Sequence, residues 1–487
     1  MQISRRNFVA GGSLAATFSA LSCRGGGGSS SSVAPPGPPP GTSNSFEQLI
    51  LNRGAYGPRP GEVEALAARG LEDWLDEQLN PGGIDDSVVD EQIAALEYYN
   101  LSAEELKLHH HLDVQLDLGR ATILRALLSR RQLWESMVEF WSDHFHMALA
   151  KLPYLTRLRV VYDRDVLRRH AFGRVRDIVL ATARSPAMLV SLDNVLNEKW
   201  NINENYAREL MELHTLGVDA GYTQADVEEL GRALTGWSVA ATDSFVFHEE
   251  GHDAKSKRVF GMDIGEGGGV DEVERLIDYF VSRPEAAQFI CTKLVRRFVA
   301  DDPPQSLVDR VVTDYQTTGG DVKVMLRTIF LSPEFADAPR KVKRPYKYAV
   351  SCLRALDVDP RVIDYTLQFC AQMGQPLFHW PMPDGYPDTS EVWTAGLLSR
   401  WNWCLSLLNG ELGAVNDAVA RSAAQAVDID AAVDSLAKRI LGRSLEVETQ
   451  TALVDYIGPG LPLDPAIQAR LRDAVALMFA HPEFQWA

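Results

Sequence analysis

Apolar residues recur at three- and four-residue spacing along almost the whole chain from Phe46 onward. This is the period of an α-helix that buries one face. One such stripe consists of Leu133, Trp134, Met137, Val138, Trp141 and Phe145. Similar stripes cover Val175–Leu189, Asn205–Leu216, Ala225–Leu234, Val273–Phe280, Glu285–Phe298, Ser306–Tyr315, Val322–Leu331, Lys347–Leu356, Thr366–Met373 and Thr394–Leu408. With 46% apolar residues to fill a core, the pattern predicts a mainly α, multi-helix globular array.

Alternating, strand-like runs are few. Ser244–His248 and Arg258–Met262 could pair as a short hairpin across the polar loop Glu249–Ser256, which predicts a small β-hairpin insertion. The glycine-rich Gly265–Gly269 is interpreted as a surface loop or linker. It is not interpreted as a phosphate-binding loop, because no strand directly precedes it and no Gly-Lys-Ser/Thr follows it. We therefore divide the chain into an N-terminal helical region, 46–264, and a C-terminal region, 265–487, packed on the first.

The C-terminal region contains a weak internal repeat, at about 285–335 and 432–484. Each copy ends in the tripeptide Pro-Glu-Phe, at Pro333–Phe335 and Pro482–Phe484. Proline cannot continue a helix, so the tripeptide is expected to end one and to tuck its aromatic ring beneath it. The pattern predicts a duplicated C-terminal helical unit.

The N-terminus has the form of an export signal. Ser4-Arg-Arg-Asn-Phe-Val9 is a twin-arginine pattern, and a weakly apolar run follows it, so residues 1–23 are predicted to be a signal peptide. Cys23 ends an imperfect lipoprotein box, which leaves a lipid anchor and plain soluble export both open. The Gly/Ser/Pro-rich residues 24–45 are predicted to be a disordered linker. We expect a protein of the periplasm or outer envelope, with no spanning segment elsewhere.

The charge excludes some partners. The formal net charge of −18 argues against nucleic acid and against an anionic membrane surface, because both reward clustered Lys and Arg. No CxxC pair occurs. An oxidising compartment would permit two disulfides, in any of three pairings, but the apolar helical context favours buried free thiols at Cys291, Cys352, Cys370 and Cys404. The sequence leaves the cofactor and the oligomeric state unknown.

The densest stretch is Asn203–Gly217, which a second helix ending at Gly236-Trp237 follows. On a helical wheel, Asn205, Glu209 and Glu212 share one stripe with Arg208 beside it, and apolar residues cover most of the rest. Such a helix is expected to be buried. Its polar stripe is then either an internal Asn–Glu–Arg network that clamps neighbouring helices or a ligand, metal or catalytic site, since buried carboxylates are costly unless they are neutralised or used.

The same helical-wheel argument places three histidines. His214 lies opposite the polar stripe and is interpreted as a packing residue. His144 shares the apolar stripe of the helix predicted at 132–149, so it points inward as either a core histidine or a partner of the site. His146 falls on the opposite side and is expected to be solvated.

The block Asn203–Trp237 resembles the large bacterial family catalogued as domain of unknown function 1800, and the resemblance covers most of the chain. Further elements that fit it are Leu51–Pro60, Phe140-Trp-Ser-Asp-His-Phe145, Asp165–Gly173, Ser185–Leu189, Leu192-Asp-Asn194, His252-Asp253 with Lys257 and Gly261, Gly374–Phe378, Gly385-Tyr-Pro-Asp388, Trp393 and Arg400-Trp-Asn402. Gly-Tyr-Pro stands here where Gly-Trp-Pro is more usual. The resemblance implies an exported, mostly helical protein, and it implies no established reaction.

The leading functional hypothesis is an exported hydrolase or lyase acting on an envelope or extracellular polymer, most plausibly a glycan. Glu209 and Glu212 would be acid and base, with His144 as the third catalytic candidate. Aromatic rings with nearby amides, carboxylates and guanidinium groups are typical of sugar binding. The substrate-binding candidates are Asn205, Arg208, Trp237, His252, Asp253, Tyr386, Trp393 and Arg400.

Two alternatives stay open. One is a metal- or cofactor-binding exported protein, in which His144, Glu209, Glu212 and Asp193 would supply carboxylate and imidazole ligands suited to iron or manganese. The other is a non-enzymatic tethered scaffold that assists a secreted partner, in which case the polar stripe is a structural network.

Overall fold

The computed structural model describes residues 45–408 and 413–487. The predicted signal peptide, Cys23 and all but the last residue of the predicted linker lie outside these residues. Residues Asn44–Ala487 form one compact unit. The division into 46–264 and 265–487 therefore stays a prediction.

Helices dominate the described residues, which confirms the predicted mainly α class. The first part of the chain supplies α2 (Phe46–Gly54), α3 (Glu62–Arg69), α4 (Leu71–Gln78), α5 (Ser87–Ala94), α6 (Ala103–Leu106), α7 (His111–Leu128), α8 (Gln132–His144), α9 (Leu155–Tyr162) and α10 (Arg168–His170). The middle part supplies α11 (Val175–Ala183), α12 (Pro186–Ser191), α13 (Asn205–Glu209), α14 (Gln224–Leu234) and α15 (Asp271–Val281).

The rest of the chain adds α16 (Pro284–Phe298), α17 (Gln305–Thr318), α18 (Val322–Phe330), α19 (Pro333–Ala336), α20 (Pro345–Leu356), α21 (Ile363–Gln372), α22 (Ser390–Trp393), α23 (Leu397–Leu408), α24 (Gly413–Ala423), α25 (Ile429–Leu441), α26 (Val447–Ile457), α27 (Pro465–Ala480) and α28 (Pro482–Gln485). Two π-helical segments, η3 (Asp163–Leu167) and η5 (Leu210–Thr215), interrupt the α-helical pattern. Short 3₁₀ turns occur at η2 (Pro81–Gly83), η4 (Asn194–Leu196), η6 (Glu249–Gly251), η7 (Pro360–Val362) and η8 (Thr394–Gly396).

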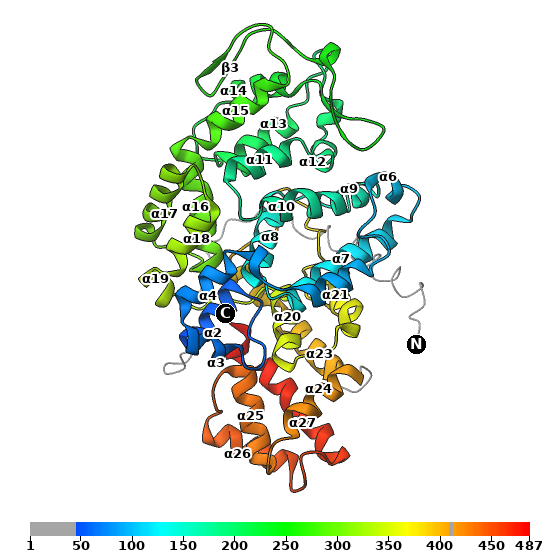
Figure 1. Cartoon of the computed structure of the whole chain (residues 1–487), viewed down its shortest axis with the longest axis vertical. Helices are drawn as coiled ribbons and strands as arrows, with labels where there is room; N and C mark the ends of the chain where they lie inside the picture. The colour runs from blue at the N-terminus through cyan, green and yellow to red at the C-terminus, as the bar shows by residue number, and fades with distance from the viewer. Residues whose placement is uncertain (1–44, 409–412) are drawn as a thin grey trace, which may run out of the picture. The chain divides into compact units, whose positions relative to one another are not determined.

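The helices surround a large apolar core, and Val342, Tyr386 and Trp393 form a second, smaller cluster. In Figure 1, α11–α15 lie at one end of the described chain, α25–α27 lie at the other, and α7, α8 and α20 lie between them. Cys291, Cys352, Cys370 and Cys404 are buried free thiols, as predicted. In the described ranges, no helix is long and apolar enough to cross a bilayer.

The strands form two hairpins instead of the single pairing expected from the sequence. β1 (Trp237–Val239) pairs with β2 (Phe245–Phe247), and β3 (Lys257–Val259) pairs with β4 (Met262–Ile264). Phe260 and Gly261 both have positive φ, at 49° and 88°. A turn with two such residues matches the twist of adjacent strands, so the chain reverses there and pairs locally. The predicted pairing of Ser244–His248 with Arg258–Met262 was therefore wrong.

The two copies of the predicted repeat share an order of helices. The series α16, α17, α18 and α19 corresponds to α25, α26, α27 and α28, and Pro-Glu-Phe opens the last, short helix of each series. Phe335 is 0% exposed and Phe484 is 4% exposed. Both aromatic rings are thus core residues, as the pattern predicted.

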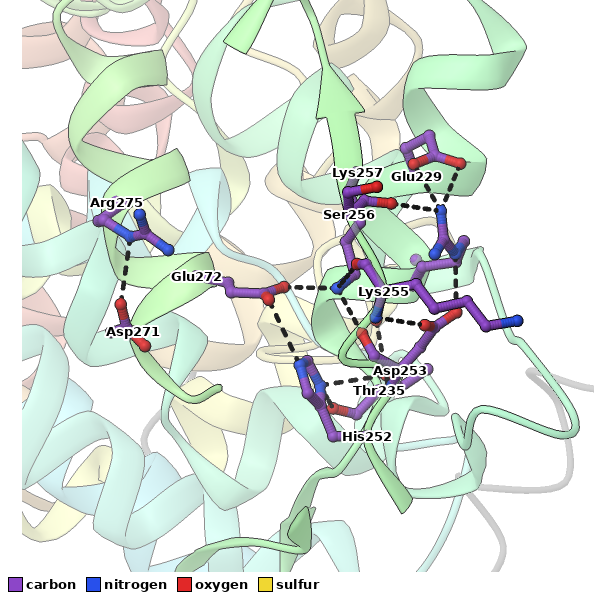
Figure 2. Close-up of polar contacts among 12 residues, drawn as sticks. Glu229, Thr235, His252, Asp253, Lys255, Ser256, Lys257, Asp271, Glu272 and Arg275 are labelled. Atoms are coloured by element: carbon purple, nitrogen blue, oxygen red, sulfur yellow. Dashed lines mark hydrogen bonds and ion pairs between the residues drawn. The ribbon is translucent and has the colours of Figure 1, made fainter. Parts of the chain in front are cut away.

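A buried ion pair ties the strand insertion to α15. The Lys257 ammonium lies 2.8 Å from a Glu272 carboxylate oxygen, and both side chains are 0% exposed. Lys257 also donates to two main-chain carbonyls, those of Asp253 and Lys255. His252 approaches the other Glu272 oxygen at 3.6 Å. Figure 2 shows these groups converging from the loop before β3 and the first turn of α15.

Lys257→Met should destabilise the protein strongly, because it leaves the Glu272 carboxylate buried without its cation. We expect the free energy of unfolding to fall by about 3–5 kcal/mol, measured by urea denaturation. The control is Arg258→Met, which removes a neighbouring cation whose pair with Asp263 is 69% and 75% exposed. Arg258→Met should lower the free energy of unfolding by less than about 1 kcal/mol. Equal losses in the two variants would contradict a buried ion pair.

Candidate functional site

The central helix changes geometry midway. α13 ends at Glu209, and the chain continues as the π-helical η5. The Leu216 amide bonds to the Met211 carbonyl at 2.9 Å, five residues back. A π segment widens the turn, so a wheel drawn at 100° per residue loses register beyond Glu209. Single π turns occur frequently at functional sites.

The two glutamates of this helix both reach solvent. Tyr206, Leu210 and Met211 are at most 1% exposed, which confirms the predicted buried apolar face. Glu209 and Glu212 are partly exposed. Burial raises the pKa of Glu209 above its usual range, and the neighbouring Glu212 carboxylate raises it further. Glu209 is therefore a carboxyl group that holds its proton more tightly than an ordinary glutamate.

The polar residues next to the glutamates are paired elsewhere. The Asn205 amide donates to the Leu192 carbonyl at 3.1 Å and to Asp193 at 3.3 Å. Asp193 also pairs with Lys151 at 2.8 Å. Arg208 donates to Gln224 at 2.7 Å and lies 3.6 Å from Glu204. The described contacts thus give Arg208 partners other than Glu209 and Glu212.

A loop distant in the sequence brings a third acid to Glu209. Asp384, in the loop between α21 and α22, lies within electrostatic range of Glu209 and contributes to its raised pKa. The Trp380 indole N–H donates to Asp384 at 2.9 Å. Burial lowers the pKa of Lys293 on α16 to about 8, and the field of nearby aspartates, Asp384 among them, opposes this shift. Asp384 therefore adds negative charge near both Glu209 and Lys293.

His144 points inward, as predicted, but not toward the glutamates. It is 1% exposed, and its Nε2 lies 3.2 Å from the main-chain carbonyl of His214. Because a carbonyl only accepts, Nε2 carries the hydrogen. Burial lowers the pKa of His144 well below its usual range and that of His214 to about 3. Both imidazoles are neutral at physiological pH, and His214 is the predicted packing residue.

His146 is buried, at 3% exposed, which corrects the expectation that it is solvated. α8 ends at His144, and Phe145 leaves helical geometry at φ −107° and ψ 51°. The helical wheel therefore does not extend to His146. Its Nε2 lies 2.9 Å from the carbonyl of Trp380, so it helps to hold the loop that carries Asp384.

A nearly buried network of charges anchors the same loop. Glu139 pairs with Arg297 at 2.7 Å and with Arg344 at 2.6 Å. Asp388 pairs with the same two arginines, at 2.9 and 3.2 Å. Asp143 pairs with Arg344 at 2.7 Å. These five residues, which we name the arginine–carboxylate network, join α8, α16, the start of α20 and the loop before α22.

The network shifts its carboxyl groups in opposite directions. Burial raises the pKa of Asp143 to about 6 despite the opposing field of Arg344. The guanidinium groups of Arg297 and Arg344 overcome burial and hold the pKa of Asp388 well below its usual range. A cavity of about 40 Å³ lies beside Glu139 and Asp143, under Tyr346 and Tyr386. That volume has room for water but not for a sugar.

The aromatic substrate-binding candidates are packed in the interior. Trp237, Tyr386 and Trp393 are 0%, 6% and 5% exposed. Arg400 is 0% exposed and bonds to Gln485 at 3.0 Å and to the Lys343 carbonyl at 2.7 Å. These four side chains would have to be displaced before they could contact a ligand.

His252 and Asp253 belong to the strand insertion. His252 Nδ1 lies 2.8 Å from the Thr235 carbonyl, and Asp253 accepts from Arg232 at 2.8 Å. The Arg232 hydrogen bond lowers the pKa of Asp253 to about 2. Both residues thus hold the insertion on α14 and α15, and no described contact joins them to Glu209 or Glu212.

The possible metal ligands do not form one cluster. Over residues 45–408 and 413–487, no group of three or more His, Cys, Asp or Glu side chains is arranged to hold a metal ion. Among the proposed ligands, Glu209 lies next to Glu212, whereas Asp193 pairs with Lys151 and His144 faces His214.

Sequence reasoning missed the arginine–carboxylate network and Asp384, although a signal was present. Asp143 lies inside Phe140-Trp-Ser-Asp-His-Phe145, and Asp388 ends Gly385-Tyr-Pro-Asp388. The structure places these two motifs in contact. Gly385 has φ +76°, and a Cβ there would overlap the carbonyl oxygen of Asp143. A glycine is needed at this position for the loop to approach α8.

The fold and the site define a class of mainly α-helical protein with half-buried carboxyl groups beside a charged loop. The family model described as "Protein of unknown function (DUF1800)" matches residues 49–486, so the chain belongs to this family, as the sequence motifs indicated. Searches of curated proteins and of solved structures gave no match.

The raised pKa of Asp143 predicts a pH-dependent stability. Its carboxyl titrates near pH 6 in the folded protein and near its ordinary 3.8 in the unfolded chain. Between these values the folded state holds a proton that the unfolded state has lost, so stability falls as the pH rises through this window. Asp143→Asn removes this loss. We expect its free energy of unfolding, relative to the wild type, to rise by about 3 kcal/mol from pH 4 to pH 7 in urea titrations.

The exposed Asp309→Asn is the matched control, because it removes one carboxylate that no described contact joins to the network. Its stability relative to the wild type should vary little over the same pH range. A pH-independent difference for Asp143→Asn would contradict a proton held by Asp143.

Proposed function

We propose that this protein is an exported hydrolase or lyase that cleaves a polymer of the cell envelope or extracellular space, most plausibly a glycan. Glu209 would be the general acid and Glu212 the general base. The observation that carries the proposal is the raised pKa of Glu209 beside the second, partly exposed carboxylate of Glu212. A carboxyl group with a raised pKa next to a second carboxylate is typical of acid–base catalysis.

The proposed chemistry follows from these environments. A carboxyl with a raised pKa keeps its proton closer to neutral pH, so Glu209 would protonate the oxygen of the leaving group. Glu212 would take a proton from an attacking water in a hydrolase, or from a ring carbon in a lyase. Tyr222 lies beside Glu212, whose charge adds to burial in raising the pKa of Tyr222 to about 12. Its hydroxyl would stay protonated and donate to the substrate or to Glu212.

A polymer is favoured over a small molecule by the openness of the site. Asn205 is exposed, and Arg208, Glu209 and Glu212 are partly exposed, so a long chain has access to this face of α13 and η5. The cavity beside Asp143 is too small for a sugar and lies under the loop. Export is part of the proposal, and it is supported by the twin-arginine pattern at Ser4–Val9. The lipid anchor at Cys23 is left open.

Glu209→Gln should abolish most of the cleavage, because an amide cannot donate a carboxyl proton but keeps the shape of the side chain. We expect kcat/KM to fall by about 100-fold or more for Glu209→Gln and for Glu212→Gln. Reducing ends and unsaturated sugar products would be measured on peptidoglycan, a uronate polymer, xylan and chitin. Glu228→Gln, an exposed carboxylate on α14, is the matched control and should cleave like the wild type.

Two results would contradict the proposal. One is that the wild type cleaves none of these polymers, and the other is that both glutamine variants cleave as well as the wild type does. Either result would favour the tethered scaffold, in which the polar face of α13 is structural.

A further inference from the structure

The short hairpin between η4 and α13 presents a tryptophan to solvent. Trp200 is 65% exposed. The flanking residues Glu198 and Asn201 bond to each other through both main chains, N to O at 3.3 Å and 2.8 Å. Tryptophan is highly buried on average in folded proteins. An indole held at the tip of a two-residue turn is therefore a candidate for ligand binding.

The hairpin is held firmly, so the exposure of Trp200 is built into the fold. The Lys199 amide donates to the Gly251 carbonyl at 2.8 Å. Asn197 is 1% exposed. Its side chain donates to the Gly231 carbonyl at 2.9 Å and accepts from the Asn203 amide at 2.9 Å. These bonds fix the base of the turn on α14 and on the strand insertion.

The groups around the indole are suited to hydroxyl-rich ligands. The Lys199 ammonium lies 5.7 Å from the centre of the Trp200 ring. Asn201 is an exposed amide that follows Trp200 directly in the chain. An aromatic face with amide and ammonium groups around it offers stacking and hydrogen bonds together, which is what a sugar ring requires.

Other occupants fit this surface less well. Leu196 and Ile202 are the nearby exposed apolar residues, at 61% and 42%. The surface area exposed by Trp200, Leu196 and Ile202 together falls far short of the roughly 800 Å² that each partner buries in a stable protein interface. The net charge of −18 disfavours an anionic membrane.

The hairpin also lies close to the proposed catalytic pair along the chain. Trp200 precedes Asn205 by five residues, which span at most about 18 Å. From Asn205 to Glu209 the helix α13 rises by about 6 Å. A bound polymer of a few sugar units is long enough to reach from one to the other.

We infer that Trp200 is a binding platform on which one sugar ring of a polymeric glycan stacks, on the ring face that the Lys199 ammonium does not cover, with Lys199 and Asn201, its neighbours in the chain, as hydrogen-bond donors. The choice of a glycan rests on the proposed function. The site itself rests on the exposed ring and on the rigid turn that carries it. It would hold the polymer while Glu209 acts on a neighbouring bond.

Binding to peptidoglycan, xylan, chitin and a uronate polymer tests this inference directly. Co-sedimentation serves for the insoluble polymers and affinity electrophoresis for the soluble one. We expect the wild type to bind at least one of them. Trp200→Ala should bind it about tenfold more weakly, whereas Trp200→Phe, which keeps an aromatic face, should retain most of the affinity. Trp401→Ala is the matched control, because Trp401 is also exposed, at 44%, but lies on α23. It should bind like the wild type.

The same assay separates this inference from the proposed function. Glu209→Gln should still bind while failing to cleave, and Trp200→Ala should keep its cleavage rate at saturating polymer. If Trp200→Ala binds as the wild type does, or if the wild type binds none of the four polymers, the platform is refuted. Cleavage that depends on Glu209 would survive the first result. Trp200-dependent dimerisation, or binding to neutral lipid vesicles, would also overturn the inference by assigning the ring to another occupant.

Discussion

The arginine–carboxylate network is the interaction on which the rest of the site depends. Arg297 and Arg344 each contact both Glu139 and Asp388. These side chains come from α8, α16, the start of α20 and the loop before α22, which are far apart in the chain. Buried charges are costly to desolvate, and here Glu139 and Asp388 each have two opposite partners, whereas Asp143 has Arg344. Removing Arg344 would take the cation from Asp143 and leave Glu139 and Asp388 with Arg297, so the charges depend on one another.

The loop that carries Asp384 is positioned by this network. The network holds the loop between α21 and α22 against α8, and Gly385 allows the two chains to approach closely. The loop in turn carries Asp384 to within electrostatic range of Glu209. The raised pKa of Glu209 thus has two sources. One is local, in the burial of η5 and the proximity of Glu212, and the other is the distant loop.

Much of the architecture could be predicted from the sequence, because helical periodicity is a local property. The mainly α class and the inward direction of His144 follow from spacing alone. Spacing alone does not predict the π-helical turn at η5, the end of α8 at His144 or the local pairing of β3 with β4. Each depends on main-chain geometry that departs from the regular period, and a helical wheel assumes that period throughout.

The candidate site was predictable only in part, for the same reason. Glu209 and Glu212 lie on one helix, so their proximity is local and could be inferred. The pairing of Asp143 with Arg344 and the approach of Asp384 to Glu209 join residues that are 201 and 175 positions apart. The opposite error occurred with Trp237, Tyr386 and Trp393. Their aromatic character suggested ligand binding, but all three side chains are buried. Trp200, by contrast, is exposed on a turn that helical periodicity does not detect.

The central claim is that Glu209 is a carboxyl with a raised pKa next to a second carboxylate. Carboxyl-carbon NMR of selectively labelled glutamate would measure it, with Glu209→Gln to assign the signal and Glu212→Gln to remove the neighbouring charge. The account predicts that Glu209 titrates above the ordinary range of a glutamate, and that its pKa falls in the Glu212→Gln variant. An ordinary pKa for Glu209, unchanged by that substitution, would contradict the account.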